Sequence, residues 1–178
     1  MSEKKFIDPN TITDFPVVVL VDDLRGFVGW GIKTHTKGNY NHVMTLYRPG
    51  YCASQGFWMY ADVPLKKYLR PGIMLKFWAL KGCSAEIKRQ IIDKNTADLK
   101  LPWWRRGYDY LGILGQATGI KWVQTPWKHF CSEAVAEDLR LDPKLREVIP
   151  ERPSPADLDR IFEAHPEYFE CAGYWIGE

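Results

Sequence analysis

The chain has 178 residues, with 24 basic and 22 acidic side chains, a net charge of +2 and 46% hydrophobic residues. This length suits a single domain over residues 1–178, and the composition excludes a disordered tail, a collagen-like fibre and a coiled coil. The balanced charge gives no support to nucleic-acid binding. The chain also carries 8 Trp, 9 Tyr and 8 Phe, an aromatic content that requires a large core, an exposed apolar groove, or both.

Four strands are expected in the first half of the chain. Val17–Val21 is short and β-branched, as in a buried strand. Residues 41–47 alternate, which puts His42, Met44 and Leu46 on one face and Val43, Thr45 and Tyr47 on the other. After a turn at Arg48-Pro49-Gly50, a second strand over Phe57–Ala61 makes 41–61 a hairpin with a long loop. Ile73–Leu80 is the fourth strand.

Helical spacing begins after residue 84. Ser84 is expected to cap a helix with Ile87, Ile91 and Ile92 on its apolar face, and residues 108–118 and 131–139 outline two more helices. A proline-rich linker follows, and Ser154-Pro155-Ala156-Asp157 opens a last helix. Cys171–Ile176 is a final strand. The order predicts an α+β domain whose mainly antiparallel sheet is packed by helices.

The four cysteines form no CxxC pair, and the first ten residues lack the apolar segment of a signal peptide. No stretch approaches the roughly 18 apolar residues of a membrane span. We therefore expect a cytoplasmic protein with free thiols and no membrane span, unless another route releases it.

Cys131 is the thiol whose neighbours suggest chemistry. It begins a helix, where backbone N–H groups favour a thiolate, lower the thiol pKa and can stabilise an oxyanion. Its helical face also carries Ala134 and Val135, so the thiol is expected to point toward the sheet. A thiol nucleophile then needs an imidazole from that sheet, and His42 is the candidate, ahead of His129.

The order of these motifs carries a family resemblance. The series is Asn41-His42-Val43, Tyr60-Ala61-Asp62-Val63-Pro64-Leu65, Gly107-Tyr108-Asp109, Phe130-Cys131-Ser132-Glu133 and Ser154-Pro155-Ala156-Asp157-Leu158. Over about residues 14–160 the chain resembles the circularly permuted NlpC-type papain-like proteins of the YiiX-like branch, which are related to lecithin retinol acyltransferase. The resemblance implies a permuted papain-like fold, with Cys131 as nucleophile and His42 as general base.

The same resemblance implies a thiol hydrolase, peptidase or amidase, or an acyltransferase, that works through a thioester and needs no cofactor. Its substrate contains an amide or ester carbonyl, in a cell-wall peptide, another peptide or a lipid acyl group. The family's third catalytic position, usually Glu or His on the strand after the His strand, falls on Tyr60 here, with Gln55 and Asp62 as alternatives.

Other residues allow further interpretations. Trp103, Trp104 and Trp127 are expected to line an aromatic substrate cleft beside Cys131, whereas Glu133 suits a structural role in the first helical turn. A metal site from His129, Cys131, His42 and Cys52 lacks the usual spacing, and residues 103–108 alone do not make a nucleic-acid surface. The remaining alternative is an inactive papain-like domain that serves as a binding module.

Overall fold

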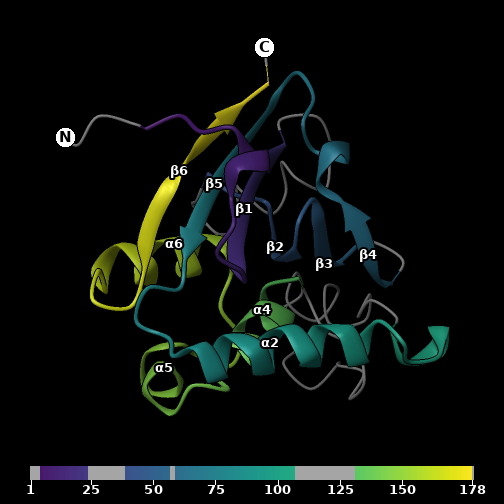
Figure 1. Ribbon diagram of the computed structural model, residues 1–178, viewed down its shortest axis with the longest axis vertical. Helices are drawn as coiled ribbons and strands as arrows, with labels where there is room; N and C mark the ends of the chain where they lie inside the picture. Colours follow the sequence, from purple (N-terminus) through teal and green to yellow (C-terminus); the bar gives the residue numbers. More distant parts are fainter. Residues whose placement is uncertain (1–4, 24–38, 57–58, 107–130, 178) are drawn as a thin grey trace, which may run out of the picture.

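The computed structural model describes residues 5–23, 39–56, 59–106 and 131–177. Its centre is a six-stranded antiparallel sheet with the order β4-β3-β2-β1-β5-β6 (Figure 1). The strands are β1 (Val17–Asp23), β2 (His42–Arg48), β3 (Tyr51–Gln55), β4 (Tyr60–Pro64), β5 (Ile73–Ala79) and β6 (Glu170–Ile176). The predicted α+β class with a mainly antiparallel sheet is therefore confirmed.

The turn after β2 corrects the expected hairpin. Gly50 has a φ of +70°, in the left-handed region that glycine favours, and β3 begins at the next residue. The long loop expected within 41–61 is thus replaced by a tight turn and an extra strand. The predicted second strand of this hairpin becomes β4, which starts at Tyr60, while Phe57 and Trp58 lie outside the described residues. The β3 sequence, YCASQ, lacks the apolar alternation that would have revealed it.

The described residues form four α-helices: α2 (Ala85–Asp98), α4 (Cys131–Leu139), α5 (Pro143–Val148) and α6 (Pro155–Ala164). The predicted caps are confirmed, since Ser84 accepts a hydrogen bond from the Ile87 N–H and Ser154 makes a capping box with Asp157. The bounds expected for α4 are also confirmed. The helix expected over 108–118 lies outside the described residues.

The stretch expected to be a linker contains α5. Asp142 caps this helix by accepting from the Lys144 N–H, and Pro143 occupies its first turn, where a missing N–H costs no hydrogen bond. Leu145 is buried in the core, so the proline-rich appearance concealed a short apolar face. The linker prediction was wrong because proline at a helix start is favourable, whereas proline inside a helix is not.

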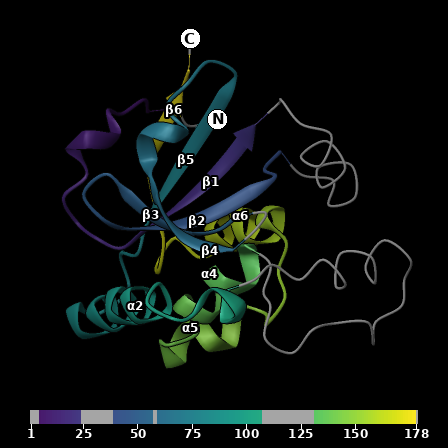
Figure 2. The ribbon, with the colours of Figure 1, turned by 90° about the vertical axis from the view of Figure 1, so that its right-hand side faces the viewer.

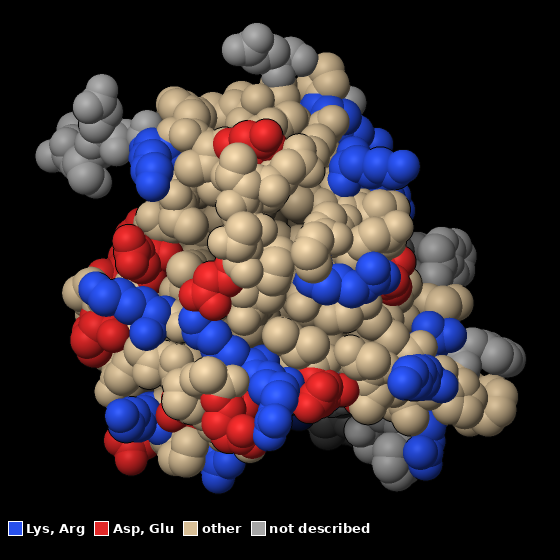
Figure 3. Space-filling view, viewed as in Figure 1, with Lys and Arg blue, Asp and Glu red and all other residues tan. Residues whose placement is uncertain are grey.

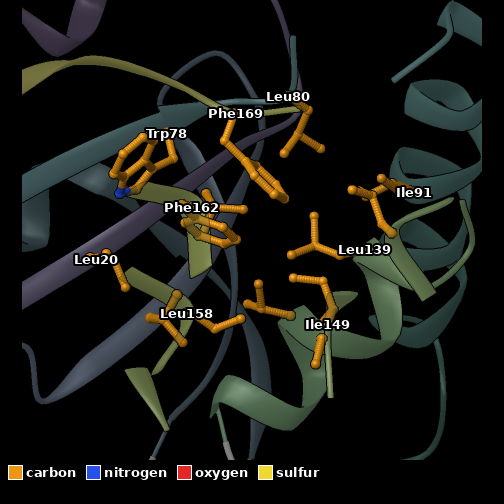
Figure 4. Close-up of a cluster of buried hydrophobic side chains, with 14 of the residues drawn as sticks. Leu20, Trp78, Leu80, Ile91, Leu139, Ile149, Leu158, Phe162 and Phe169 are labelled. Carbon is orange, nitrogen blue, oxygen red and sulfur yellow. The ribbon is translucent and has the colours of Figure 1, made fainter. Parts of the chain in front are cut away.

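The helices supply the core on one face of the sheet. In Figure 2, α2, α4 and α5 lie together below the strands. Figure 4 shows side chains from the helices and the sheet meeting in one cluster, in which the Phe162 ring lies 4.2 Å from that of Phe169 and 5.6 Å from that of Trp78, between centroids. These contacts place Cys131 in a large apolar core that also contains Val43 and Leu20.

The opposite face of the sheet is buried as well. Val19, Met44 and Phe77 belong to a second apolar cluster, against which Ile7, Ile12, Phe15, Tyr68 and Leu69 pack from segments outside the strands. Burial on both faces explains why β1 reads as a continuous apolar run. Phe77 and Trp78 are core residues.

Charged side chains cover the outer surface of the helices. Figure 3 shows both signs concentrated along the lower part of the molecule, where α2 and α5 lie in Figure 1. On α2 these include pairs at helical spacing, Arg89 with Glu86 and Lys94 with Asp98. Within the described ranges, no helix has the length and apolar character needed to cross a membrane.

Candidate functional site

Cys131 lies at the first residue of α4, against the start of β2. Only 7% of the residue is exposed. The backbone N–H groups of Val43, Ser132 and Cys131 itself are near enough to its sulfur to favour the thiolate and so to oppose the rise in its pKa. The last two belong to the helix start, where N–H groups have no partner within the helix. The sulfur therefore lies beside Val43, the residue that follows His42 in the chain.

A gap in the sheet makes room for this sulfur. The ladder between β2 and β3 runs from Arg48 to Thr45, which pairs with Ala53, and ends there. If its register continued, Gln55 would stand opposite Val43. The ladder stops before this pair, the side-chain amide of Gln55 donates to the Arg106 carbonyl at 3.4 Å, and the Val43 N–H lies near the Cys131 sulfur.

The His42 imidazole is held from the side of β3. Its Nε2 lies 2.9 Å from the Ser54 hydroxyl oxygen, and its ring stacks on Tyr68 with 6.1 Å between centroids. Burial, and then the positive charge of Lys67, lower the pKa of His42 to about 4. The imidazole is therefore neutral at pH 7.

The thiol is also neutral at pH 7, contrary to the expectation from its helix position. Burial raises the pKa of Cys131 to about 11, although the three N–H groups at the sulfur act in the opposite direction. The expected effect of the helix start is present, but the desolvation of a thiolate in this core outweighs it.

The face of β2 covered by α4 also differs from the one expected. The Thr45 hydroxyl donates to Asp138 on α4 at 3.1 Å, and Val43 shares the core cluster of Cys131. Met44, on the face shared with His42, belongs to the opposite cluster. The thiol thus approaches β2 from the α4 side, while the imidazole projects from the alternate face at the open end of the ladder.

The three residues considered for the third position have other partners. The Tyr60 hydroxyl donates to Asn95, Gln55 contacts Arg106, and Asp62 accepts from Tyr47 and Arg48. Ser54 takes the place beside the imidazole that the sequence assigned to Tyr60. The reason is the unexpected strand: β3, not the strand that carries Tyr60, follows the His strand and pairs with it.

Ser54 and Tyr68 are therefore the residues that sequence reasoning missed. Tyr68 follows the short 3-10 helix Leu65–Lys67, and a hydrogen bond with Ser54 partly opposes the burial that raises the tyrosine pKa. A register for β2 and β3 would have revealed Ser54, because it then shares the face of Met44 and His42. Nothing in the local sequence marks Tyr68.

The other predicted residues fall into two groups. Glu133 is 8% exposed, and its Oε1 lies 3.6 Å from the Arg152 Nε, which suits the structural role expected for it. Trp104 is 62% exposed, and Trp103 begins a 3-10 helix that ends at Arg105. Trp127 and His129 lie outside the described residues, as do Tyr108 and Asp109.

The four cysteines are free, as expected from their spacing. Cys52 is buried in the second apolar cluster, on the face of the sheet opposite Cys131. In the described part of the chain, no three His, Cys, Asp or Glu side chains gather as a metal ion would require. Of the four residues considered as metal ligands in the sequence, His129 lies outside the described residues.

Comparison with known proteins gives no family. No protein-family model matches the chain, and no curated protein matches it either. A function for this chain must therefore be inferred from its residues and from the geometry of the site around Cys131.

Proposed function

We propose that the protein is a thiol hydrolase or acyltransferase of the permuted papain-like kind, with Cys131 as nucleophile and His42 as general base. The observation that carries the proposal is the packing of the start of α4 on the start of β2, where Cys131 and Val43 share one core cluster, because it brings the thiol to the residue next to His42. The substrate has an amide or ester carbonyl, in a peptide or an acyl-containing lipid.

Because the Cys131 thiol and the His42 imidazole are both neutral at rest, the thiol must lose its proton to the imidazole during the reaction. Because the thiol and the imidazole approach β2 from different faces, the proposal requires His42 Nδ1 to reach the sulfur around the open end of the β2–β3 ladder. There Nδ1 takes the thiol proton as the sulfur attacks the carbonyl carbon, so that the S–C bond forms while the carbonyl becomes an oxyanion. The carbonyl re-forms, the C–N or C–O bond breaks, and the imidazolium returns its proton to the leaving group. Water or another acceptor then attacks the thioester, His42 takes its proton, and the S–C bond breaks with the proton returning to sulfur.

Two features support these roles. Ser54 contacts Nε2 of the imidazole, which leaves Nδ1 for the proton transfer and fixes the orientation of the ring. The N–H groups of Cys131 and Ser132, at the start of α4, lie where they can donate to an oxyanion formed next to the sulfur. Ser54 thus takes the orienting role for which the resemblance suggested Tyr60.

Trapping the thioester tests the proposal. The protein is mixed with p-nitrophenyl esters and with peptide thioesters, quenched in acid, digested and analysed by mass spectrometry. We expect an acyl group on the peptide that contains Cys131 and not on that of Cys52, with accumulation at least tenfold slower in His42→Asn. Equal acylation of both cysteines, or no effect of His42→Asn, would contradict the proposal.

A second candidate is a binding module without turnover. The burial that keeps both the thiol and the imidazole neutral favours it, because neither group is ionised for reaction at pH 7. In that case the protein binds the acyl compound and returns it chemically unchanged, and Cys131→Ala leaves the dissociation constant within about twofold of the parent.

A further inference from the structure

A buried carboxylate lies two helical turns after Cys131. Asp138 is 2% exposed on the inner face of α4. Its Oδ2 accepts hydrogen bonds from Thr45 on β2 at 3.1 Å and from Asn95 on α2 at 2.7 Å, and its Oδ1 lies 3.2 Å from the Lys94 ammonium. Asp138 therefore joins its own helix to a strand and to a second helix.

The network extends to a fourth element. Asn95 is fully buried, and its Oδ1 accepts a hydrogen bond from the Tyr60 hydroxyl on β4. Its Nδ2 also donates to the Ile91 carbonyl at 2.8 Å. Lys94 makes a second ion pair with Asp98 at 2.8 Å. Each of these polar side chains is thus tied to a particular partner, which apolar side chains of similar size would not require.

The two ends of the inner face of α4 contact the same strand. Cys131 meets the Val43 N–H, and Asp138 meets the Thr45 hydroxyl. The two α4 residues are about 10 Å apart along the helix, and the two β2 residues are about 7 Å apart along the strand. Two contacts fix both the rotation of α4 and its position along β2, which a single contact cannot do.

We propose that the network of Asp138, Thr45, Asn95 and Lys94 is a positioning element that sets the register of α4 on β2 and thereby holds the Cys131 thiol at the Val43 N–H. The apolar contacts of Val135 and Ala136 between the same elements are non-directional and tolerate small shifts. Buried polar contacts set register more sharply than apolar ones. The importance of this position for catalysis rests on the proposed function, but the positioning itself does not.

A matched pair of substitutions tests the network. Thr45→Val keeps the side-chain shape and removes the hydroxyl that donates to Asp138, whereas Thr45→Ser keeps the hydroxyl. The measurement is the rate of alkylation of Cys131 by iodoacetamide from pH 7 to 11, followed on the Cys131 peptide by mass spectrometry, together with the amide signal of Val43 in ¹H–¹⁵N spectra.

We expect Thr45→Val to slow the alkylation of Cys131 several-fold at pH 9 and to shift its pH profile upward, because a displaced thiolate loses the Val43 hydrogen bond. The Val43 amide signal should move in Thr45→Val and in Asp138→Asn, as it should in Cys131→Ala, and Thr45→Ser should keep both readouts as in the parent. General loosening has the opposite sign, since partial unfolding exposes the thiol and speeds alkylation.

Ser154→Ala supplies the control for lost stability. It removes the cap of α6 and leaves α4 untouched, so the pH profile and the Val43 signal should stay as in the parent. An unchanged pH profile and an unmoved Val43 signal in folded Thr45→Val would overturn the positioning role. These readouts need no turnover, so a protein that hydrolyses nothing would refute the proposed function and leave this test intact.

Discussion

Two buried thiols on neighbouring elements illustrate how local backbone geometry changes a cysteine. Cys52 lies within an intact ladder, paired with Leu46 on one side and Val63 on the other, and burial followed by the charge of Asp62 raises its pKa. Cys131 is buried to a similar extent, but three backbone N–H groups point at its sulfur and limit the rise to about 11 in its pKa. The difference arises because Cys131 lies at a helix start, where N–H groups have no partner within the helix, whereas Cys52 lies inside a ladder.

The largest expected effect separates these two thiols by activity. Cys131→Ala should lower kcat/KM for ester or amide hydrolysis by about 10³-fold or more, as removal of a nucleophile does. Cys52→Ala should leave it within about threefold, because Cys52 only fills space in the apolar cluster. The measurement is steady-state hydrolysis of the substrate that acylates the protein. Equal losses in both variants would erase the distinction.

A smaller effect concerns the two candidates for orienting the imidazole. Ser54→Ala should lower kcat by about 10- to 100-fold with little change in KM, because His42 loses the contact at Nε2. Tyr60→Phe removes a hydroxyl that contacts Asn95 instead, and should cost only a few-fold. If Tyr60→Phe had the larger effect on kcat, Tyr60 would hold the orienting role that its sequence position suggested.

The thiols should also differ in their dependence on pH. Alkylation of Cys131 in the folded protein should rise toward pH 11. At pH 10 it should be well over tenfold faster than that of Cys52, because burial raises the pKa of Cys52 further and each unit of pKa difference changes the thiolate fraction about tenfold. Peptide mass spectrometry after a short exposure to iodoacetamide measures both rates in one sample. A plateau for Cys131 already at pH 7 would indicate a preformed thiolate and contradict the neutral pair.

The smallest expected effect is on the free energy of unfolding at acid pH. It comes from His42, beside the Cys131 site, and not from the region of Cys52. The folded pKa of His42 is about 4, below its ordinary value of 6.5. Between these values the unfolded chain binds more protons, so the contribution of His42 to stability, complete above pH 6.5, decreases as the pH falls toward 4. His42→Asn should therefore lose about 2 kcal/mol less free energy of unfolding than the parent between pH 7 and 5. Urea denaturation at the two pH values measures this, with Cys52→Ala expected to follow the parent.

Much of the fold was predictable because its signals are local. The β-branched run of β1, the alternation in β2 and the serine caps of α2 and α6 each depend on residues within a few positions of one another. The same holds for the start of α4 at Cys131. The short strand β3 and the helix α5 were missed, the first because its residues are small and polar and the second because Pro143 looked like part of a linker.

For the candidate site the sequence offered only a pair of residues, whose catalytic roles stay a prediction. The sequence named Cys131 and His42, but it placed the imidazole on the face covered by α4 and gave its orientation to Tyr60. Both points depend on which strand lies beside β2 and in which register. Ser54 becomes visible only once β3 is known to pair with β2, 12 positions beyond His42.

The amino-acid order by itself therefore determined the class of the fold, the main helices and strands, and the helix start that carries the thiol. These features follow from hydrogen bonds and apolar periodicity within short segments. The tertiary structure alone decided the ionisation of the thiol and the imidazole, the partner of His42 and the link from Asp138 to β2. Each of these depends on burial and on contacts between segments far apart in the chain, which no local pattern specifies.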